Sequence, residues 1–187
     1  MISRFLLGAK HWQVFLAFLA LLLVERSATE PAVATASISM SYLSLLARML
    51  PGLCYWIWFW ALGSVLNSIV HPELRPRRVV FLTATTFVGL FATLFEPMIL
   101  VTRMDWDTML TILYFSLFFL IFFECYVLYF LARNLVLAET TRPVSFRDFI
   151  GSFLLFWFYP IGIWFLQPRI NRLYAETMGT AQEAAPN

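Results

Sequence analysis

The stretch that decides the fold runs from Gly151 to Asn171 and reads GSFLLFWFYPIGIWFLQPRIN. It is aromatic and carries no charge before Arg169. Pro160 lacks the amide N–H that a helix needs at an interior position, and Gly162 offers a bend nearby. The apolar part, Ile150–Leu166, either crosses a membrane as a short kinked helix or re-enters it. The choice decides on which side the chain continues, and the sequence leaves both placements open.

The composition is that of an integral membrane protein. Of the 187 residues, 61% are hydrophobic, 18% are aromatic and 13% are charged, whereas an ordinary soluble domain has about 25% charged residues. The long apolar runs lack the polar face that a soluble helix keeps in water. The net charge of +2 is too weak to indicate nucleic acid, and the arginines lie between apolar runs. We therefore expect a membrane protein that binds no nucleic acid.

Five apolar segments predict an all-α fold, an integral membrane helical bundle. Two of them exceed the roughly 20 residues that span about 30 Å of hydrocarbon, and the second segment carries only neutral polar groups. We expect four spanning helices plus a short fifth segment broken by proline, in one domain of residues 1–176, followed by a disordered tail of residues 177–187. The segments are Trp12–Val24, Leu53–Val70, Val79–Val101, Met109–Ala132 and Ile150–Leu166.

The first segment, Trp12–Val24, has two interpretations. It is shorter than a full span, so a retained helix has to extend backwards or continue past Glu25. Arg4 and Lys10 before it, and Ala32-Val33-Ala34 after it, also fit a cleaved signal peptide. The polar gap ahead of that cleavage pattern is long, which favours the retained helix.

Lys and Arg residues near the segment ends predict a cytoplasmic N-terminus, because cytoplasmic loops are rich in these residues. If the fifth segment spans, eight of them lie on the N-terminal side and five on the other. If it re-enters, Arg169 and Arg172 change sides and the counts become ten and three. Both placements predict a multi-pass protein of the inner (plasma) membrane with its N-terminus in the cytoplasm.

Three polar side chains inside the predicted spans are candidate functional groups: Glu96, Glu124 and Asn67. The two carboxyl groups lie at depths that differ by roughly 15 Å, so they do not form a pair. A carboxyl group in a membrane is a functional candidate because its ionisation there is costly. Such a group also serves as a structural hydrogen-bond partner between helices, and this is the commoner role.

Small residues indicate where the helices pack. Thr85, Gly89 and Thr93 recur every four residues and form a stripe that lets another helix approach closely. Gly63 shares one face of the second segment with two tryptophans and Asn67. We expect these two faces to meet, and a ligand groove lined by tryptophan is the less favoured interpretation.

No pattern for catalysis, a metal or a cofactor is visible in the sequence. His11 and His71 lie outside the spans and cannot ligate a haem as a pair, and Cys54 and Cys125 stand alone in apolar segments. Walker, GxGxxG, HExxH and GxSxG motifs are absent. We therefore expect no catalytic residue, no metal ion and no cofactor.

Four stretches of the chain carry a resemblance. HWQVF begins at His11, LG at Leu62 is followed by LRP at Leu74, LYFLAR begins at Leu128, and FWFYPIGIWFLQPRIN begins at Phe156. Together they resemble an uncharacterised family of small bacterial polytopic membrane proteins. The resemblance implies an architecture and carries no activity or site. Its most specific part is the last stretch, with the signature residues Pro160, Gly162, Gln167, Pro168 and Arg169.

Three functions are compatible with these features. We expect a non-catalytic accessory or scaffolding subunit that packs against itself or a membrane protein partner, because packing surface is abundant and polar groups are few. The alternative is a small channel or transporter in which Glu124 and Asn67 line a polar path. The third is a lipid-acting enzyme that uses Glu96 and Arg103 near the headgroups. The lipid bilayer is a partner in each case.

Overall fold

The structure, a computed structural model, describes residues 42–102 and 105–183, together with residues 12, 13, 15–17, 19–21, 23, 24 and 26. Side chains are described for all of these except residues 42–47, 96, 97, 99–102, 160 and 178–183. This part of the chain is all-helical and contains no strand, as the sequence predicts. Its elements are α3 (Tyr42–Ile69), the short 3-10 helix η1 (Pro72–Leu74), α4 (Arg78–Thr102), α5 (Trp106–Thr140), α6 (Phe146–Trp157) and α7 (Tyr159–Glu183).

Three helices are long and apolar enough to cross a membrane, by their length and composition. They correspond to the second, third and fourth predicted segments. The described residues of the first predicted segment, Trp12–Val24, are also helical, and the ring of Phe15 lies 6.1 Å from the ring of Trp164 in α7. The three membrane-spanning candidates are Arg48–Ile69, Arg78–Phe95 and Trp106–Thr140.

Helix α3 begins earlier than the sequence predicts. The predicted segment starts at Leu53, after a Pro-Gly pair, but Pro51 lies inside the helix. Gly52 packs directly against α4, where an added Cβ would stand 2.8 Å from the carbonyl oxygen of Ala92. Tertiary packing thus maintains the helix across a residue pair that breaks isolated helices.

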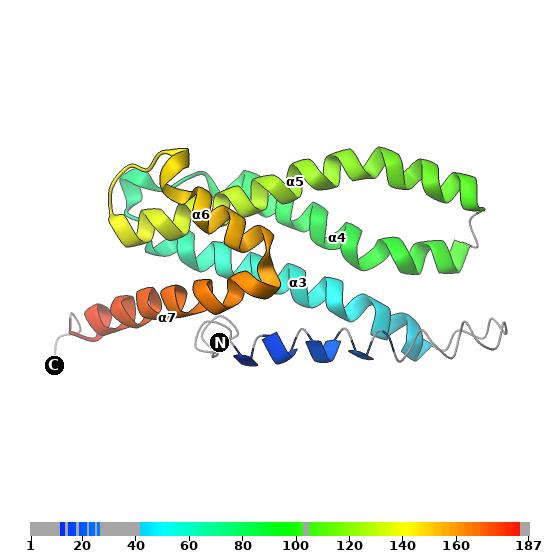
Figure 1. Ribbon diagram of the computed structural model, residues 1–187, viewed down its shortest axis with the longest axis horizontal. Helices are drawn as coiled ribbons and strands as arrows, with labels where there is room; N and C mark the ends of the chain where they lie inside the picture. Colours follow the sequence, from blue (N-terminus) through cyan, green and yellow to red (C-terminus); the bar gives the residue numbers. More distant parts are fainter. Residues whose placement is uncertain are drawn as a thin grey trace.

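Helices α3 and α4 form a close antiparallel pair (Figure 1). An added Cβ at Gly63 would stand 2.2 Å from the ring of Phe81, and one at Gly89 would stand 2.3 Å from the ring of Trp56. Later residues of α3 therefore meet earlier residues of α4. Because glycine has no side chain, the aromatic rings fit between the helices at these two positions.

The turn between α3 and α4 is held by arginine side chains. The guanidinium of Arg75 donates hydrogen bonds to the carbonyl oxygens of Ser68 (2.9 Å) and Val70 (3.1 Å) at the end of α3. Arg78, the first residue of α4, donates to the hydroxyl of Ser64 at 2.9 Å. The two bonds from Arg75 satisfy backbone carbonyls that a helix end leaves open, and the bond from Arg78 joins the start of α4 to α3.

Helix α5 extends well beyond the predicted segment Met109–Ala132. Its 35 residues measure about 52 Å at 1.5 Å per residue, whereas the hydrocarbon core is about 30 Å thick. At its start the backbone N–H of Thr108 donates to the carboxylate of Asp105 at 2.9 Å, and this bond holds the pKa of Asp105 below its usual value. At its end the N–H of Thr141 donates to the carbonyl of Leu137 at 3.0 Å.

The break between α6 and α7 falls at Phe158, two residues before Pro160. The N–H of Phe158 donates to the carbonyl of Leu154 at 2.9 Å and closes α6, while its carbonyl accepts the N–H of Gly162 at 2.8 Å and opens α7. The sequence predicts the interruption at the proline itself. The proline instead occupies the first turn of α7, where a helix requires no N–H.

Helices α6 and α7 fold back on each other as a hairpin (Figure 1). Near the tip, an added Cβ at Gly162 would stand 1.7 Å from the carbonyl oxygen of Leu155. Farther along, the side chain of Arg169 reaches Ser152 of α6. Because residue numbers rise in one helix as they fall in the other, the two helices are antiparallel. A single kinked helix over Ile150–Leu166 is therefore not what forms.

Helix α7 continues past the predicted segment end at Leu166. It contains Pro168 and reaches Glu183, whereas the sequence predicts a disordered tail from residue 177. Residues 184–187 lie outside the described part. Ala, Glu, Gln and Met are good helix formers, and extending a helix that is already packed requires no new nucleus.

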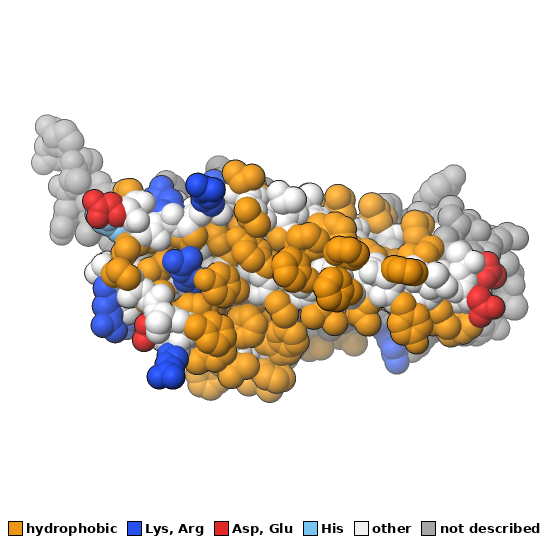
Figure 2. All heavy atoms as spheres, turned by 90° about the horizontal axis from the view of Figure 1, so that it is seen from above, with side chains coloured by type: hydrophobic (Ala, Val, Ile, Leu, Met, Phe, Trp, Pro, Cys, Tyr) orange, Lys and Arg blue, Asp and Glu red, His pale blue; other side chains and the backbone are white. Residues whose placement is uncertain are grey.

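The core lies where the C-terminal half of α5 meets α3, α4, α6 and α7. Phe130 of α5 stacks on Phe81 of α4 with ring centroids 4.2 Å apart. Tyr129 of α5 packs edge-on against Phe149 of α6 at 5.3 Å. On the face shown in Figure 2, hydrophobic side chains cover the long body of the molecule, and most of the Lys and Arg side chains in view lie toward the end that carries the α3–α4 and α5–α6 turns.

Candidate functional site

Glu124 lies near the middle of α5 and is bonded to α3. The hydroxyl of Tyr55 donates a hydrogen bond to Glu124 Oε1. The ring of Tyr55 packs against Phe59, with centroids 4.3 Å apart. The ring of Phe59 in turn lies 6.1 Å from that of Tyr159, the first residue of α7. The only predicted intramembrane acid with a described side chain therefore sits where α3, α5 and the tip of the hairpin meet.

Asn67 forms a second, separate contact. Its Nδ2 donates to Asn134 Oδ1 of α5 at 3.3 Å and to the carbonyl of Pro76 at 3.2 Å. Asn134 donates to the carbonyl of Phe130 at 2.7 Å, and both asparagines are buried. These bonds tie α3, its following turn and α5 together.

The structure does not bring Glu124 and Asn67 together. Asn134, the partner of Asn67, lies ten residues after Glu124 in α5, which is about 15 Å along the helix axis. Fully buried apolar side chains occupy the interval. They include Phe59, Leu62, Leu66, Phe130 and Leu131.

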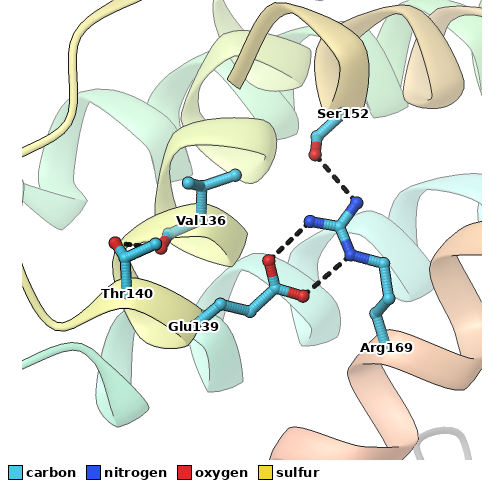
Figure 3. Close-up of polar contacts among 5 residues, drawn as sticks. All are labelled: Val136, Glu139, Thr140, Ser152 and Arg169. Carbon is cyan, nitrogen blue, oxygen red and sulfur yellow. Dashed lines mark hydrogen bonds and ion pairs between the residues drawn. The ribbon is translucent and has the colours of Figure 1, made fainter. Parts of the chain in front are cut away.

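The signature residue Arg169 anchors the hairpin to α5 (Figure 3). Its Nε donates to Glu139 Oε1 at 2.8 Å and its Nη2 to Glu139 Oε2 at 2.5 Å, a bidentate ion pair. Its Nη1 donates to the hydroxyl of Ser152 in α6 at 3.0 Å. The Glu139 side chain is 15% exposed and that of Arg169 is 31% exposed, so solvent screens this pair only in part. One guanidinium therefore joins α5, α6 and α7.

The other signature residues have structural positions in the hairpin. Gly162 allows α7 to lie against the backbone of Leu155. Gln167 is buried and donates from Nε2 to Asn171 Oδ1 at 3.1 Å. Pro168 lies on the exposed side of α7, while the side chain of Pro160 lies outside the described part of the chain.

The predicted packing residues lie between α3 and α4 or within the core. Gly63 is in contact with Phe81, and Gly89 is in contact with Trp56. Thr85 is buried, and its hydroxyl donates to the carbonyl of Phe81 at 2.8 Å. Thr93 is buried as well, against α3 at the level of Gly52.

Glu96 belongs to α4, but its side chain lies outside the described part of the chain, and Arg103 lies outside it altogether. Among the residues that are described, no group of three or more His, Cys, Asp and Glu side chains could hold a metal ion. Cys54 of α3 and Cys125 of α5 are free thiols.

Sequence reasoning missed four partner residues: Tyr55, Asn134, Glu139 and Ser152. Asn134 and Glu139 follow the predicted end of the fourth segment at Ala132, so the sequence predicts no helix at either position. Both residues belong to the part of α5 that extends past the length needed to cross a membrane, and hydropathy does not predict that extension. Tyr55 and Ser152 carry neutral hydroxyls that hydropathy does not distinguish from interfacial or packing residues.

No protein-family model, curated protein or solved structure matches the chain.

Proposed function

We propose that the protein is a multi-pass protein of the inner (plasma) membrane, with four crossings and a re-entrant hairpin made of α6 and α7. Three apolar helices support three of the crossings, and the helical residues between Trp12 and Arg26 support the fourth. The 12 residues of α6 measure about 18 Å, too short to cross about 30 Å of hydrocarbon. The reversal at Phe158 returns the chain to the side it came from.

The distribution of arginine supports a cytoplasmic N-terminus. In the hairpin arrangement, Arg169 lies beside Glu139 at the same end as the α3–α4 and α5–α6 turns. The turn and helix-end arginines of that end outnumber those near the opposite end, where Asp105 and Asp107 begin α5. Cytoplasmic ends carry the excess of Lys and Arg, and an even number of crossings returns the chain to the side of its N-terminus.

Reporter fusions test this topology. A fluorescent protein fused after Asn187 should fluoresce in the cytoplasm, and alkaline phosphatase fused at the same place should be inactive. The matched control is a fusion after Asp105, between α4 and α5, which should give the reverse result. Active phosphatase at both positions would contradict the re-entrant placement.

We propose that the function is that of a non-catalytic accessory or scaffolding subunit. The observation that carries this proposal is the aromatic surface of the N-terminal half of α5. Large side chains there project outward over successive turns and have few neighbours among the residues that the structure describes. They are Tyr114 (71% exposed), Phe115 (74%), Phe118 (71%), Phe119 (51%) and Phe122 (60%).

Aromatic rings provide large, rigid contact surfaces for another protein. Lipid chains demand only apolarity, which smaller aliphatic residues provide equally well. The outer face of α4 illustrates the contrast, because its exposed apolar side chains include Val79, Val80, Leu90 and Leu94 together with only one phenylalanine, Phe87. The α5 surface is therefore the better candidate for contact with a second copy or a membrane protein partner.

Site-specific photo-crosslinking tests the scaffolding role. A benzophenone side chain at Phe118 should give protein adducts in cell membranes. Leu90 is the matched control: Phe87 packs against Phe123 at 4.8 Å, so the antiparallel helices place Leu90 near the depth of Phe118, on the exposed face of α4. Protein adducts at Phe118 but not at Leu90 are expected. Adducts to lipid alone at both positions would overturn the proposal.

A small channel or transporter is the second candidate, and only Glu124 favours it. A carboxyl group in the middle of a long apolar helix is a common element of ion pathways. Asn67, the other residue predicted to line the path, belongs to a different contact. Proteoliposome flux of wild type and Glu124→Gln discriminates: identical flux, or none in either, removes this role.

A further inference from the structure

The Tyr55–Glu124 pair lies at mid-depth of the helices that support the membrane assignment. Glu124 is close to the centre of α5, and Tyr55 lies within the apolar stretch Arg48–Ile69 of α3. Carboxyl groups at the centre of a bilayer are costly to ionise and mark proton or ion sites. The hydroxyl of Tyr55 is positioned as a hydrogen-bond donor, so it can serve a carboxylate and a carboxylic acid alike.

The described groups that face Glu124 carry no positive charge. From α3 comes Tyr55, and on α5 itself the next residue is Cys125. The nearest described group of the hairpin is Tyr159, whose ring lies 6.1 Å from that of Phe59, the residue that packs on Tyr55. Helix α4 faces this part of α5 through the contact of Phe87 with Phe123. The charged groups of α6, an arginine and an aspartate, lie in its first turn, far from the hairpin tip.

Among the residues that the structure describes, no Lys, Arg or His compensates a charge on Glu124. The only described hydrogen bond to its carboxyl group is the one from Tyr55. Glu124 is half-buried within the chain, and a carboxylate that is held away from water usually needs either several hydrogen-bond donors or an opposite charge. Binding of a proton neutralises the carboxylate, so that Glu124 then requires neither an opposite charge nor further hydrogen-bond donors.

A row of aromatic contacts connects this pair to the hairpin tip. The ring of Tyr55 packs on Phe59, and the ring of Tyr159 packs edge-on against Trp58 with centroids 5.0 Å apart. Tyr159 directly follows the break at Phe158. The hairpin tip therefore packs on Trp58 and Phe59 of α3, and Phe59 in turn packs on Tyr55, the hydrogen-bond partner of Glu124.

We propose that Glu124 and Tyr55 form a proton-binding site, and that a proton bound there keeps the tip of the α6–α7 hairpin seated on α3. A proton from water adds to a carboxylate oxygen of Glu124, and the Tyr55 hydroxyl continues to donate to Oε1. When the proton leaves, the carboxylate recruits water, and the contacts of Tyr159 with Trp58 and Phe59 open to admit it. The site stands with or without a partner subunit, because all of its residues belong to this chain.

Two readouts on the full-length protein in lipid nanodiscs test the proposal. Infrared difference spectra recorded across pH follow the high-frequency carbonyl band of a protonated carboxyl group that is out of water, which is distinct from the bands of acids exposed to water. An environment-sensitive fluorophore on Phe158→Cys, with Cys54 and Cys125 replaced by Ala, follows the hairpin tip. Both signals should change with the same midpoint in the parent protein. Both changes should vanish in Glu124→Gln, and the midpoint should move in Tyr55→Phe.

The matched control is Glu73→Gln, because Glu73 is an exposed acid in the α3–α4 turn. This variant should keep both signals and their midpoint. Circular dichroism confirms that each variant is helical, and Tyr55→Phe provides an independent test if Glu124→Gln fails to fold. A high-frequency band that still titrates in Glu124→Gln, or the absence of such a band in the parent, overturns the proton site. A tip signal that does not follow the band overturns the coupling to the hairpin.

Discussion

The two halves of α5 are both apolar and have opposite surroundings. In the N-terminal half, Tyr114, Phe115 and Phe118 are all more than two-thirds exposed. In the C-terminal half, the side chains from Val127 to Leu137 are mostly buried among α3, α4, α6 and α7. Hydropathy shows that both halves are apolar enough to lie in a membrane. It does not report which half contacts its own chain, so the division has to come from the fold.

The largest effect should separate the two halves directly. Phe130→Ala removes a ring that stacks on Phe81 in the core, and we expect it to lower the free energy of unfolding by about 2–4 kcal/mol, mostly through the cavity that it leaves. Phe118→Ala should change it by less than about 0.5 kcal/mol, because that ring is 71% exposed and its aromatic contact among the described residues is with its neighbour Phe119. Unfolding in mixed detergent micelles measures both. Equal losses would show that the halves do not differ.

The ion pair between Arg169 and Glu139 should produce the next largest effect, and it is confined to the C-terminal half. Arg169→Gln leaves Glu139 partly buried without its cation, and we expect a loss of about 1–3 kcal/mol, less than for a fully buried pair because both groups keep some solvent contact. Glu139→Gln with Arg169→Gln should cost less than the sum of the single changes. Additive losses in this double-mutant cycle would show that the pair is not coupled.

A smaller loss is expected at the asparagine contact that joins the C-terminal half to α3. Asn134→Ala removes the bond from Asn67 and should cost about 0.5–1.5 kcal/mol, the range of side-chain hydrogen bonds between membrane helices. Ser116 is the control in the N-terminal half, since its hydroxyl bonds only to carbonyls of its own helix. Ser116→Ala should leave stability nearly unchanged in the same detergent titration.

These contrasts also define what the sequence could predict. The bounds of α4 follow closely from the arginines and the long apolar run, because a membrane excludes charge and a helix satisfies every backbone group. The length of α5 and the direction of α7 do not follow. The residues after Ala132 are polar enough to resemble a loop, and their burial depends on α6 and α7, which come later in the chain.

The candidate site was predictable by residue and not by partner. Glu124 is conspicuous because it is an acid in an apolar run, but nothing near it in sequence identifies Tyr55, which lies in another helix. Arg169 is likewise visible as a charge after the last apolar run. Its pairing with Glu139 depends on the reversal at Phe158. That reversal comes from packing of Gly162 against Leu155 rather than from the proline alone.

The smallest effect concerns the free end of the exposed half, where Asp105 caps α5. The Thr108 N–H holds the pKa of Asp105 below its usual value, so its stabilising contribution is present above the unfolded pKa and is lost as pH falls through the folded pKa. Asp105→Asn keeps a good cap without the titration. Hydrogen exchange at the amide of Thr108, corrected for its intrinsic pH dependence, should lose protection on acidification in wild type but not in Asp105→Asn. The N-terminal half has little other packing and can fray, but the fraying should stop before the packed C-terminal half. Loss of protection beyond Glu124 would show that the two halves unfold as one unit.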